Sequence, residues 1–259
     1  MMKKTFLSVL SALAIVGAVS FTSTSVEASG GVAIPQQKWS WTGPFGTFDR
    51  AALRRGLQVY TEVCSGCHSL NLMSYRNLAD IGFSEDEIKA IAADYEVEDG
   101  PDDEGEMFFR EAMPADKFVS PFANEKAARA SNNGAMPPDL SLMIKARKDG
   151  ANYVHALLNG YEEEAPEGVE LNEGMSYNHY FPGNQIAMAP PVEDDYVEYE
   201  DGTPATQQQI TSDIVTFLAW AAEPELEERK KLGLKVMIFL GLITFMLYGL
   251  KRKIWAKLH

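Results

Sequence analysis

The run Cys-Ser-Gly-Cys-His at residues 64–68 constrains this 259-residue chain more than any other feature. Two thiols spaced by two residues, with an imidazole directly after the second, form the C-x-x-C-H pattern of c-type haem attachment. Each thiol can add across one haem vinyl group, and His68 then lies beneath the iron as its axial ligand. Cys64 and Cys67 are the only cysteines, so neither is left for a disulfide framework. The motif therefore predicts one covalently bound haem c.

Two other interpretations of the motif are a redox dithiol and half of a zinc site. A paired zinc site needs a second group of ligands further along the chain, and His155, His179 and His259 occur singly. A thioredoxin-like dithiol stays open, but it leaves His68 without a role.

The N-terminus has the pattern of an export signal. Lys3 and Lys4 precede an apolar run at residues 6–19, and small residues follow as far as Ala28. The run is too short to span a bilayer comfortably, which disfavours an uncleaved anchor. We therefore predict a cleaved signal peptide at residues 1–28 and an exported haem domain at 29–231.

A second apolar segment, residues 232–250, lies near the C-terminus. It is interrupted only by Lys235, which can extend toward the membrane interface, and it approaches the roughly 20 residues that cross a bilayer. Its length and its flanking basic clusters favour a transmembrane helix over a buried core helix. Those clusters are nearly balanced, so the export signal sets the orientation, with residues 251–259 as a cytoplasmic tail.

The segment between the two ends predicts a mainly α domain with long loops. Asp49 can cap a helix from residue 50 to about 63, which would deliver the haem motif at its end. Thr206 can cap a helix at 207–222 that ends before Pro224. Further candidates are residues 140–160, with a break at 149–150, and a short helix at 84–94. We expect loops in the rest of 80–132 and in 161–204.

Apolar positions at helical spacing define the expected core of these helices. They are Leu53, Leu57 and Tyr60; Leu142, Ala146, Val154, Leu157 and Leu158; and Ile210, Ile214, Phe217, Leu218 and Trp220.

A haem that carries electrons needs a second axial ligand, and a methionine thioether is a common partner of histidine. The chain has 11 methionines. Met136 and Met188 are the two serious candidates, because each stands beside a proline pair that stiffens the backbone. His155 and His179 are the bis-histidine alternatives.

Four segments in this order resemble the cytochrome c1 family, a subunit of ubiquinol:cytochrome c oxidoreductase, the cytochrome bc1 complex. They are CSGCH at 64–68, NNGAMPPDLSLMIKARKDGANYV at 132–154, YFPGNQIAMAPP at 180–191 and AAEPELEERKKLG at 221–233. The resemblance covers essentially the whole mature chain and is of the bacterial type. It implies a class I c-type cytochrome haem domain plus one C-terminal transmembrane helix, with Met188 as the axial ligand.

The resemblance also implies the residues of the haem pocket. The Pro-Pro-Asp-Leu stretch at residues 137–140, with Pro138 in the haem pocket, would line the proximal side, where a proline carbonyl holds the histidine tautomer. Arg147 would pair with a haem propionate, although a solvated helix face is the plain alternative. Asn132 and Tyr153 would line the pocket. Some bacterial relatives brace the ligand loop with a disulfide, for which this chain has no spare cysteine.

The implied function is single-electron transfer from a Rieske iron–sulfur protein to a soluble or tethered cytochrome c, in a respiratory or photosynthetic chain. The subunit would perform no bond chemistry and bind no nucleic acid. It would assemble with cytochrome b in a dimeric complex, single-pass in the bacterial inner membrane, with its haem domain in the periplasm. Two alternatives stay open: the haem subunit of another membrane dehydrogenase or oxidase, and a haem sensor with an open sixth position.

Acidic residues outnumber basic ones by 37 to 23. Most of the excess falls in three stretches, at residues 94–106, 162–173 and 193–201. Such a surface would attract a basic acceptor, cytochrome c or c2, at low salt. Plain solvated loops are the alternative interpretation.

Overall fold

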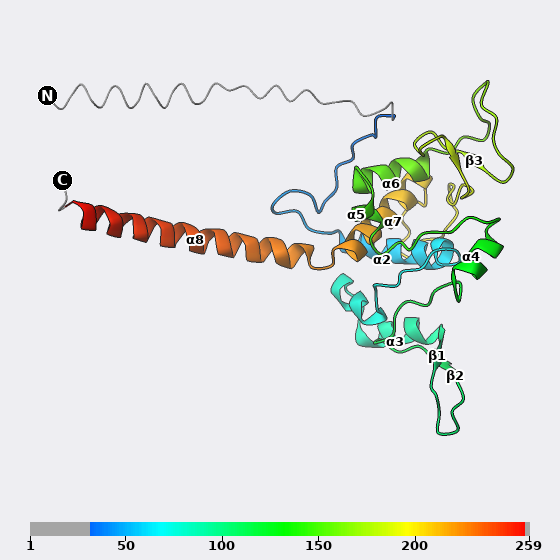
Figure 1. Ribbon diagram of the computed structural model, residues 1–259, viewed down its shortest axis with the longest axis horizontal. Helices are drawn as coiled ribbons and strands as arrows, with labels where there is room; N and C mark the ends of the chain where they lie inside the picture. Colours follow the sequence, from blue (N-terminus) through cyan, green and yellow to red (C-terminus); the bar gives the residue numbers. More distant parts are fainter. Residues whose placement is uncertain (1–31, 257–259) are drawn as a thin grey trace. The chain divides into compact units, whose positions relative to one another are not determined.

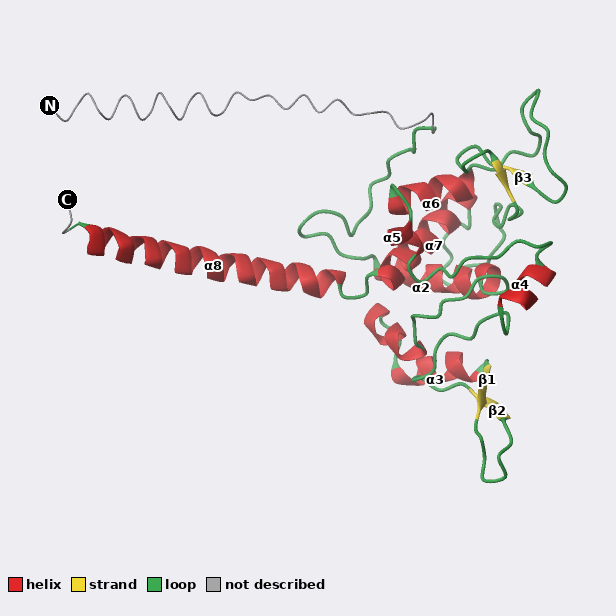
Figure 2. Ribbon diagram, in the orientation of Figure 1, coloured by secondary structure: helices red, strands yellow, loops and turns green. Residues whose placement is uncertain are grey.

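The computed structural model describes residues 32–256, and the signal peptide predicted at 1–28 lies outside the described residues. Helices dominate the described chain, and strands are short (Figures 1 and 2). The longer helices are α2 (Arg50–Val59), α3 (Glu85–Ala93), α6 (Gly150–Asn159), α7 (Gln207–Ala222) and α8 (Leu226–Trp255). The shorter helical elements are η2 (Tyr60–Cys64), η3 (Tyr75–Ile81), α4 (Glu125–Ser131) and α5 (Met143–Ala146). This confirms the mainly α class.

The helix that carries the haem motif begins where the sequence predicts. Asp49 Oδ1 accepts hydrogen bonds from Ala51 N at 2.9 Å and Ala52 N at 3.3 Å, which satisfies amides that have no partner within the helix. The chain then continues from α2 into η2, a single π turn that ends at Cys64. The predicted apolar face of this helix is buried, and it consists of Leu53, Leu57 and Tyr60.

Helix α7 packs against α2 and forms the centre of the core (Figure 1). Its start is confirmed, because Thr206 Oγ1 accepts from Gln209 N at 3.2 Å, and its predicted inward residues are all buried. Around it lie aromatic rings, among them the stacked pair Tyr75 and Phe118, whose centroids are 4.5 Å apart. The two helices therefore share one core beneath the haem motif.

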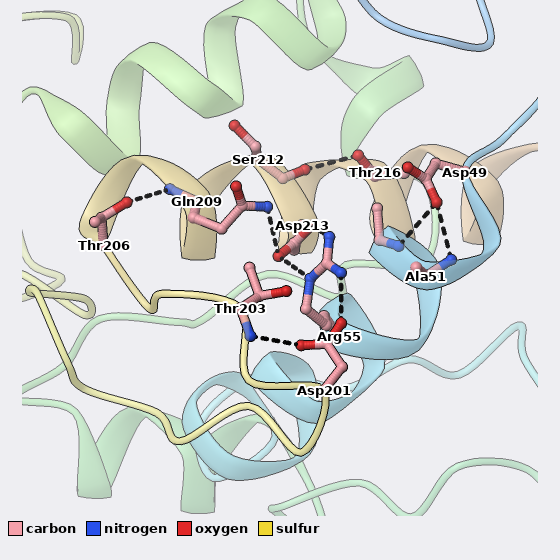
Figure 3. Close-up of polar contacts among 11 residues, drawn as sticks. Asp49, Ala51, Arg55, Asp201, Thr203, Thr206, Gln209, Ser212, Asp213 and Thr216 are labelled. Carbon is pink, nitrogen blue, oxygen red and sulfur yellow. Dashed lines mark hydrogen bonds and ion pairs between the residues drawn. The ribbon is translucent and has the colours of Figure 1, made fainter.

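An ion-pair network joins α2 to α7 and to the loop that directly precedes α7 (Figure 3). Arg55 reaches Asp213 with Nε and Nη2, at 2.8 and 3.0 Å, and Asp201 with Nη1 at 2.8 Å. Gln209 Nε2 donates to the same Asp213 carboxylate at 3.0 Å. Asp213 is almost fully buried, and a buried carboxylate needs partners. The bidentate guanidinium of Arg55 and the amide of Gln209 provide them.

The candidate helix at 140–160 is broken at the predicted place. Asp149 and Gly150 both have positive φ, 63° and 48°, at the point where α6 begins after α5 has ended at Ala146. The core prediction for its first half was wrong, however, because Leu142 is 46% exposed and Ala146 is also exposed. The helix α5 spans four residues only, so no continuous apolar stripe extends from it into α6.

Two of the predicted loops contain secondary structure. Within 80–132 lie α4 and an antiparallel hairpin of β1 (Glu96–Asp99) with β2 (Phe108–Glu111); within 161–204, β3 (Ser176–Tyr177) pairs with β4 (Gln185–Ile186). Arg110 on β2 holds Asp99 at 2.5 Å and Asp116 at 2.6 Å. The short helix expected at 84–94 is confirmed as α3, capped by Ser84.

Helix α8 contains the apolar segment predicted at 232–250. It is long and apolar enough to cross a membrane, and its most apolar stretch is not buried within the chain. Its first turns are tied to the segment before α2: Glu227 Oε1 accepts from Phe48 N at 2.9 Å, and Lys230 Nζ donates to Gly46 O at 3.0 Å. These bonds attach the start of the anchor helix directly to the domain.

Candidate functional site

The C-x-x-C-H motif forms a tight turn at the end of η2. The amides of Cys67 and His68 both donate to Cys64 O, at 3.1 and 2.9 Å, which brings the three residues together. Cys67 is exposed and Cys64 is partly buried, and the two thiols are not joined in a disulfide. Burial raises the pKa of the Cys64 thiol to about 12.

One hydrogen bond determines which nitrogen of His68 can bind a metal. His68 Nδ1 lies 2.8 Å from the carbonyl oxygen of Pro138. A carbonyl only accepts, so Nδ1 carries the proton and Nε2 keeps its lone pair. Burial lowers the pKa of His68, and this favours the neutral ring that a metal ligand requires.

The segment that supplies the Pro138 carbonyl is fastened to the residues after His68. Asp139 Oδ2 accepts from Ser69 Oγ and Asn71 N, each at 2.8 Å, and Oδ1 accepts from Ser141 N at 2.9 Å. Burial raises the pKa of Asp139, but these hydrogen bonds outweigh it and the pKa is lowered overall. The sequence analysis included Asp139 in the proximal stretch but gave it no role of its own, although an aspartate typically forms turns by accepting from the amide two residues further on.

Met188 is partly buried and lies just after β4, whereas Met136 is 40% exposed. The hairpin before Met188 is held by a buried asparagine rather than by a disulfide. Asn178 Oδ1 accepts from the amides of Tyr180 and Phe181, both at 3.1 Å, and its Nδ2 donates to Leu157 O at 2.8 Å. The loop is therefore anchored to α6 even though the chain has no spare cysteine.

The other predicted pocket residues lie at the ends of short helices and on α6. Asn132 ends α4 and donates from Nδ2 to Ala128 O at 2.7 Å. Arg147 follows α5 and is exposed. The only hydrogen bond that its side chain makes in the described chain goes to Ala146 O, at 3.2 Å. Tyr153 on α6 is partly buried, which raises its pKa, while the nearby charge of Arg147 opposes that rise.

One polar group of this region was missed by the sequence analysis. Tyr161 directly follows α6 and Gly160, and its hydroxyl oxygen is buried without a hydrogen-bond partner in the described structure. Burial raises the pKa of Tyr161, and the nearby Tyr153 adds to that rise. An orphaned hydroxyl depends on tertiary packing, so no local pattern marks it.

The sequence of the chain matches a known family over most of its length. The family model described as the Cytochrome C1 family matches residues 39–258. The chain belongs to the cytochrome c1 family. It is 52% identical over 241 residues to the cytochrome c1 of Rhodospirillum rubrum, covering 87% of this chain and 89% of that protein.

Other relatives extend the match beyond one organism. A mitochondrial cytochrome c1 heme protein of Arabidopsis thaliana is 50% identical, over 94% of this chain and 80% of the relative. A cytochrome b/c1 protein of Bradyrhizobium diazoefficiens is 49% identical over 87% of this chain, which corresponds to 36% of that longer protein. Membership of the cytochrome c1 family identifies the chain as an electron-transfer haem subunit of a cytochrome bc1 complex.

The residues that the structure places in this region of the cytochrome c1 chain fit a c-type haem. They offer two unpaired thiols and an imidazole with a defined free nitrogen. Within residues 32–256, no three histidine, cysteine or carboxylate side chains gather as they would around a bare metal ion.

The bis-histidine alternatives have other surroundings in this cytochrome c1. His155 is buried between α6 and α7, with Nε2 3.4 Å from Ser212 Oγ and its ring edge-on to Trp39. Burial lowers its pKa. His179 Nδ1 lies 3.9 Å from Glu162 Oε1 near the surface. His155 therefore acts as a packing residue.

Proposed function

We propose that this cytochrome c1 carries a single haem c attached to Cys64 and Cys67, with His68 and Met188 as axial ligands. It would accept single electrons from a Rieske iron–sulfur protein and pass them to a basic cytochrome c or c2. The observation that carries the proposal is the hydrogen bond between His68 Nδ1 and Pro138 O, since it aims the free Nε2 away from the protein carbonyl.

The bound haem supplies a one-electron iron couple. The chain's own residues hold the ligands in place: Pro138 O fixes the imidazole tautomer, and the Tyr60 hydroxyl donates to His68 O at 3.1 Å. Asp139 keeps the Pro138 segment against the motif. The thioether of Met188 would favour the reduced state, and Arg147, Tyr153 and Asn132 would line the pocket.

In the membrane, residues 1–28 would be removed and the haem domain, residues 29–231, would face the periplasm. Helix α8 would cross the bacterial inner membrane once at residues 232–250, leaving 251–259 in the cytoplasm. Its partners would be cytochrome b and the Rieske protein in a dimeric complex. The length and apolar composition of α8 support the single crossing.

Haem attachment is tested on the full chain in solubilised membranes. Under denaturing electrophoresis, the haem should stay with the polypeptide, and Cys64→Ala or Cys67→Ala should weaken that retention. The control is His155→Gln, which alters a packing histidine and should leave the haem attached. Release of all haem from the unaltered chain would refute c-type attachment.

Two further measurements separate this function from its alternatives. Co-purification with a cytochrome b and a Rieske protein supports the bc1 complex, whereas recovery with a different dehydrogenase or oxidase would contradict it. Carbon monoxide should not bind the reduced haem if Met188 fills the sixth position; binding to the unaltered protein would favour a sensor.

A further inference from the structure

The hydroxyl of Tyr161 is buried and makes no hydrogen bond within the described chain. Leaving a buried donor unsatisfied costs about 1–3 kcal/mol, so such groups usually have a partner in the functional molecule. Within residues 32–256 only two other buried side-chain atoms share this condition, the Tyr199 hydroxyl and the Thr211 hydroxyl. Tyr199 stands beside Arg55, whose guanidinium carbon lies 5.6 Å from the centre of the Tyr199 ring.

The backbone around Tyr161 is fixed on both sides. Tyr161 forms an antiparallel bridge with Asn178, and His179 N donates to Gly160 O at 2.8 Å. A Cβ on Gly160 would come within 2.5 Å of the Tyr180 ring, so the two segments are in close contact. The backbone position of Tyr161 is therefore fixed by its pairing with the segment at residues 178–180.

Two polar side chains near Tyr161, those of Tyr153 and Arg147, can donate hydrogen bonds. Tyr153 lies within electrostatic reach of it, and Arg147 lies within reach of Tyr153. Burial raises the pKa of Tyr161 well above its usual range, which keeps the hydroxyl protonated. The adjacent carboxylate of Glu162 is exposed and faces His179 instead. A cation and two hydroxyls that have no carboxylate partner in the described chain are suited to a carboxylate ligand.

We infer that the Tyr161 hydroxyl donates a hydrogen bond to a carboxylate of the bound haem, alongside Tyr153 and Arg147. This inference rests on the proposed function and adds to it a positioning residue that ties the haem to the hairpin before Met188. A donor at this carboxylate offsets negative charge near the iron, and so it favours the reduced haem.

The test is Tyr161→Phe in the full chain within its membrane complex, with Tyr199→Phe as the matched control. At a pH well above the carboxyl range of about 4, we expect the reduction equilibrium to shift two- to tenfold toward the ferric haem. This is about 18 to 59 mV at 59 mV per tenfold change. Haem retention and resistance to carbon monoxide should be unchanged. Tyr199→Phe should leave the potential where it was.

A second arm uses Arg147→Gln alone and combined with Tyr161→Phe. If both side chains act on one carboxylate, their effects on the potential should be non-additive. An unchanged potential in a haem-loaded Tyr161→Phe protein would overturn the inference and leave the proposed function standing. Loss of haem from the unaltered chain would instead refute the proposed function.

If the Tyr161→Phe complex does not accumulate, a second measurement takes the place of the potential. Redox-difference infrared spectra are then recorded on the unaltered complex with isotopically labelled tyrosine. A labelled tyrosine band that moves with the haem redox state is expected, and its absence would overturn the inference.

Discussion

The carbonyl oxygen of Asp213 lies 2.2 Å from the position that a Cβ on Gly56 would occupy. A Cβ there would also be 2.6 Å from the Cβ of Phe217, so α2 and α7 approach each other as closely as their backbones allow. Because α2 leads through η2 into the haem motif, this contact sets where Cys64 emerges from the core.

We expect Gly56→Ala to destabilise the domain although alanine is the better helix former. The gain in helix propensity is at most about 1 kcal/mol, whereas overpacking of this kind costs about 1–3 kcal/mol. The melting temperature should fall by a few degrees, at about 2–4 °C per kcal/mol for a chain of this size. Gly249→Ala is the control, since a Cβ there meets no atom within 4 Å. An equal or higher melting temperature for Gly56→Ala would contradict the close contact.

The ion pair of Asp201 should appear in the acid stability of the protein. Hydrogen bonds from Thr203, and then Arg55, lower the pKa of Asp201 from 3.8 to about 2. As the pH falls, the Asp201 carboxylate is therefore protonated in the unfolded chain before it is protonated in the folded one. The stabilisation from its charge is complete above about pH 4 and is lost as the pH falls through 2.

Asp201→Asn should accordingly lower the melting temperature near neutral pH, and the difference from the unaltered protein should close between pH 4 and 2. Asp103→Asn, on an exposed loop, is the control, and its melting temperature should follow that of the unaltered protein at every pH. A constant difference for Asp201→Asn down to pH 2 would show that the carboxylate charge does not contribute.

Local signals made much of this fold predictable. Asp49, Ser84 and Thr206 each stand directly before a helix that they cap, and Asp149 stands where the chain breaks. The β1–β2 hairpin was not predicted, because Glu96, Glu98 and Asp99 interrupt any apolar alternation. Its pairing joins residues nine to fifteen positions apart, which no short sequence pattern indicates.

The site divides in the same way. The C-x-x-C-H motif is contiguous and can be recognised from the sequence alone. Pro138 lies 70 residues from His68, and it was predicted only from the family resemblance. The hydrogen bonding of Asp139 and of Tyr161 was not predicted, because tertiary packing determines which polar partners each of them has. Sequence patterns report helix ends well and buried hydrogen bonding poorly.

The choice between the two proline-flanked methionines can be decided by substitution. Met188→Leu should lower the reduction potential sharply and open the reduced haem to carbon monoxide, because a thioether favours the reduced iron and leucine cannot coordinate. Met136→Leu should change both far less, since Met136 is 40% exposed beyond α4. Potentiometric titration and carbon monoxide difference spectra provide the comparison. The opposite ranking would assign the sixth position to Met136.

Almost all acidic residues of the three stretches are exposed, but some of their carboxylates are already bonded to neighbouring groups. Asp99 is paired with Arg110 and Asp201 with Arg55, while Asp102 Oδ1 accepts from the amides of Glu104 and Glu106 at 3.0 and 2.9 Å. These three carboxylates hold local structure, so a test of electrostatic steering should leave them intact.

For the hairpin stretch, we therefore expect the informative variant to combine Asp103→Asn, Glu104→Gln and Glu106→Gln, with comparable sets at 162–173 and 193–200. If a stretch guides a basic cytochrome, its neutralisation should lower the bimolecular electron-transfer rate at low salt and flatten the salt dependence, because the Debye length is only about 8 Å at 0.15 M. The haem potential should stay unchanged, since these side chains are solvated loop residues. Only residues near the exposed haem edge can matter, so at most one or two of the three stretches should respond. Stopped-flow rates across a salt series measure this, and rates indifferent to salt in the unaltered protein would exclude electrostatic steering.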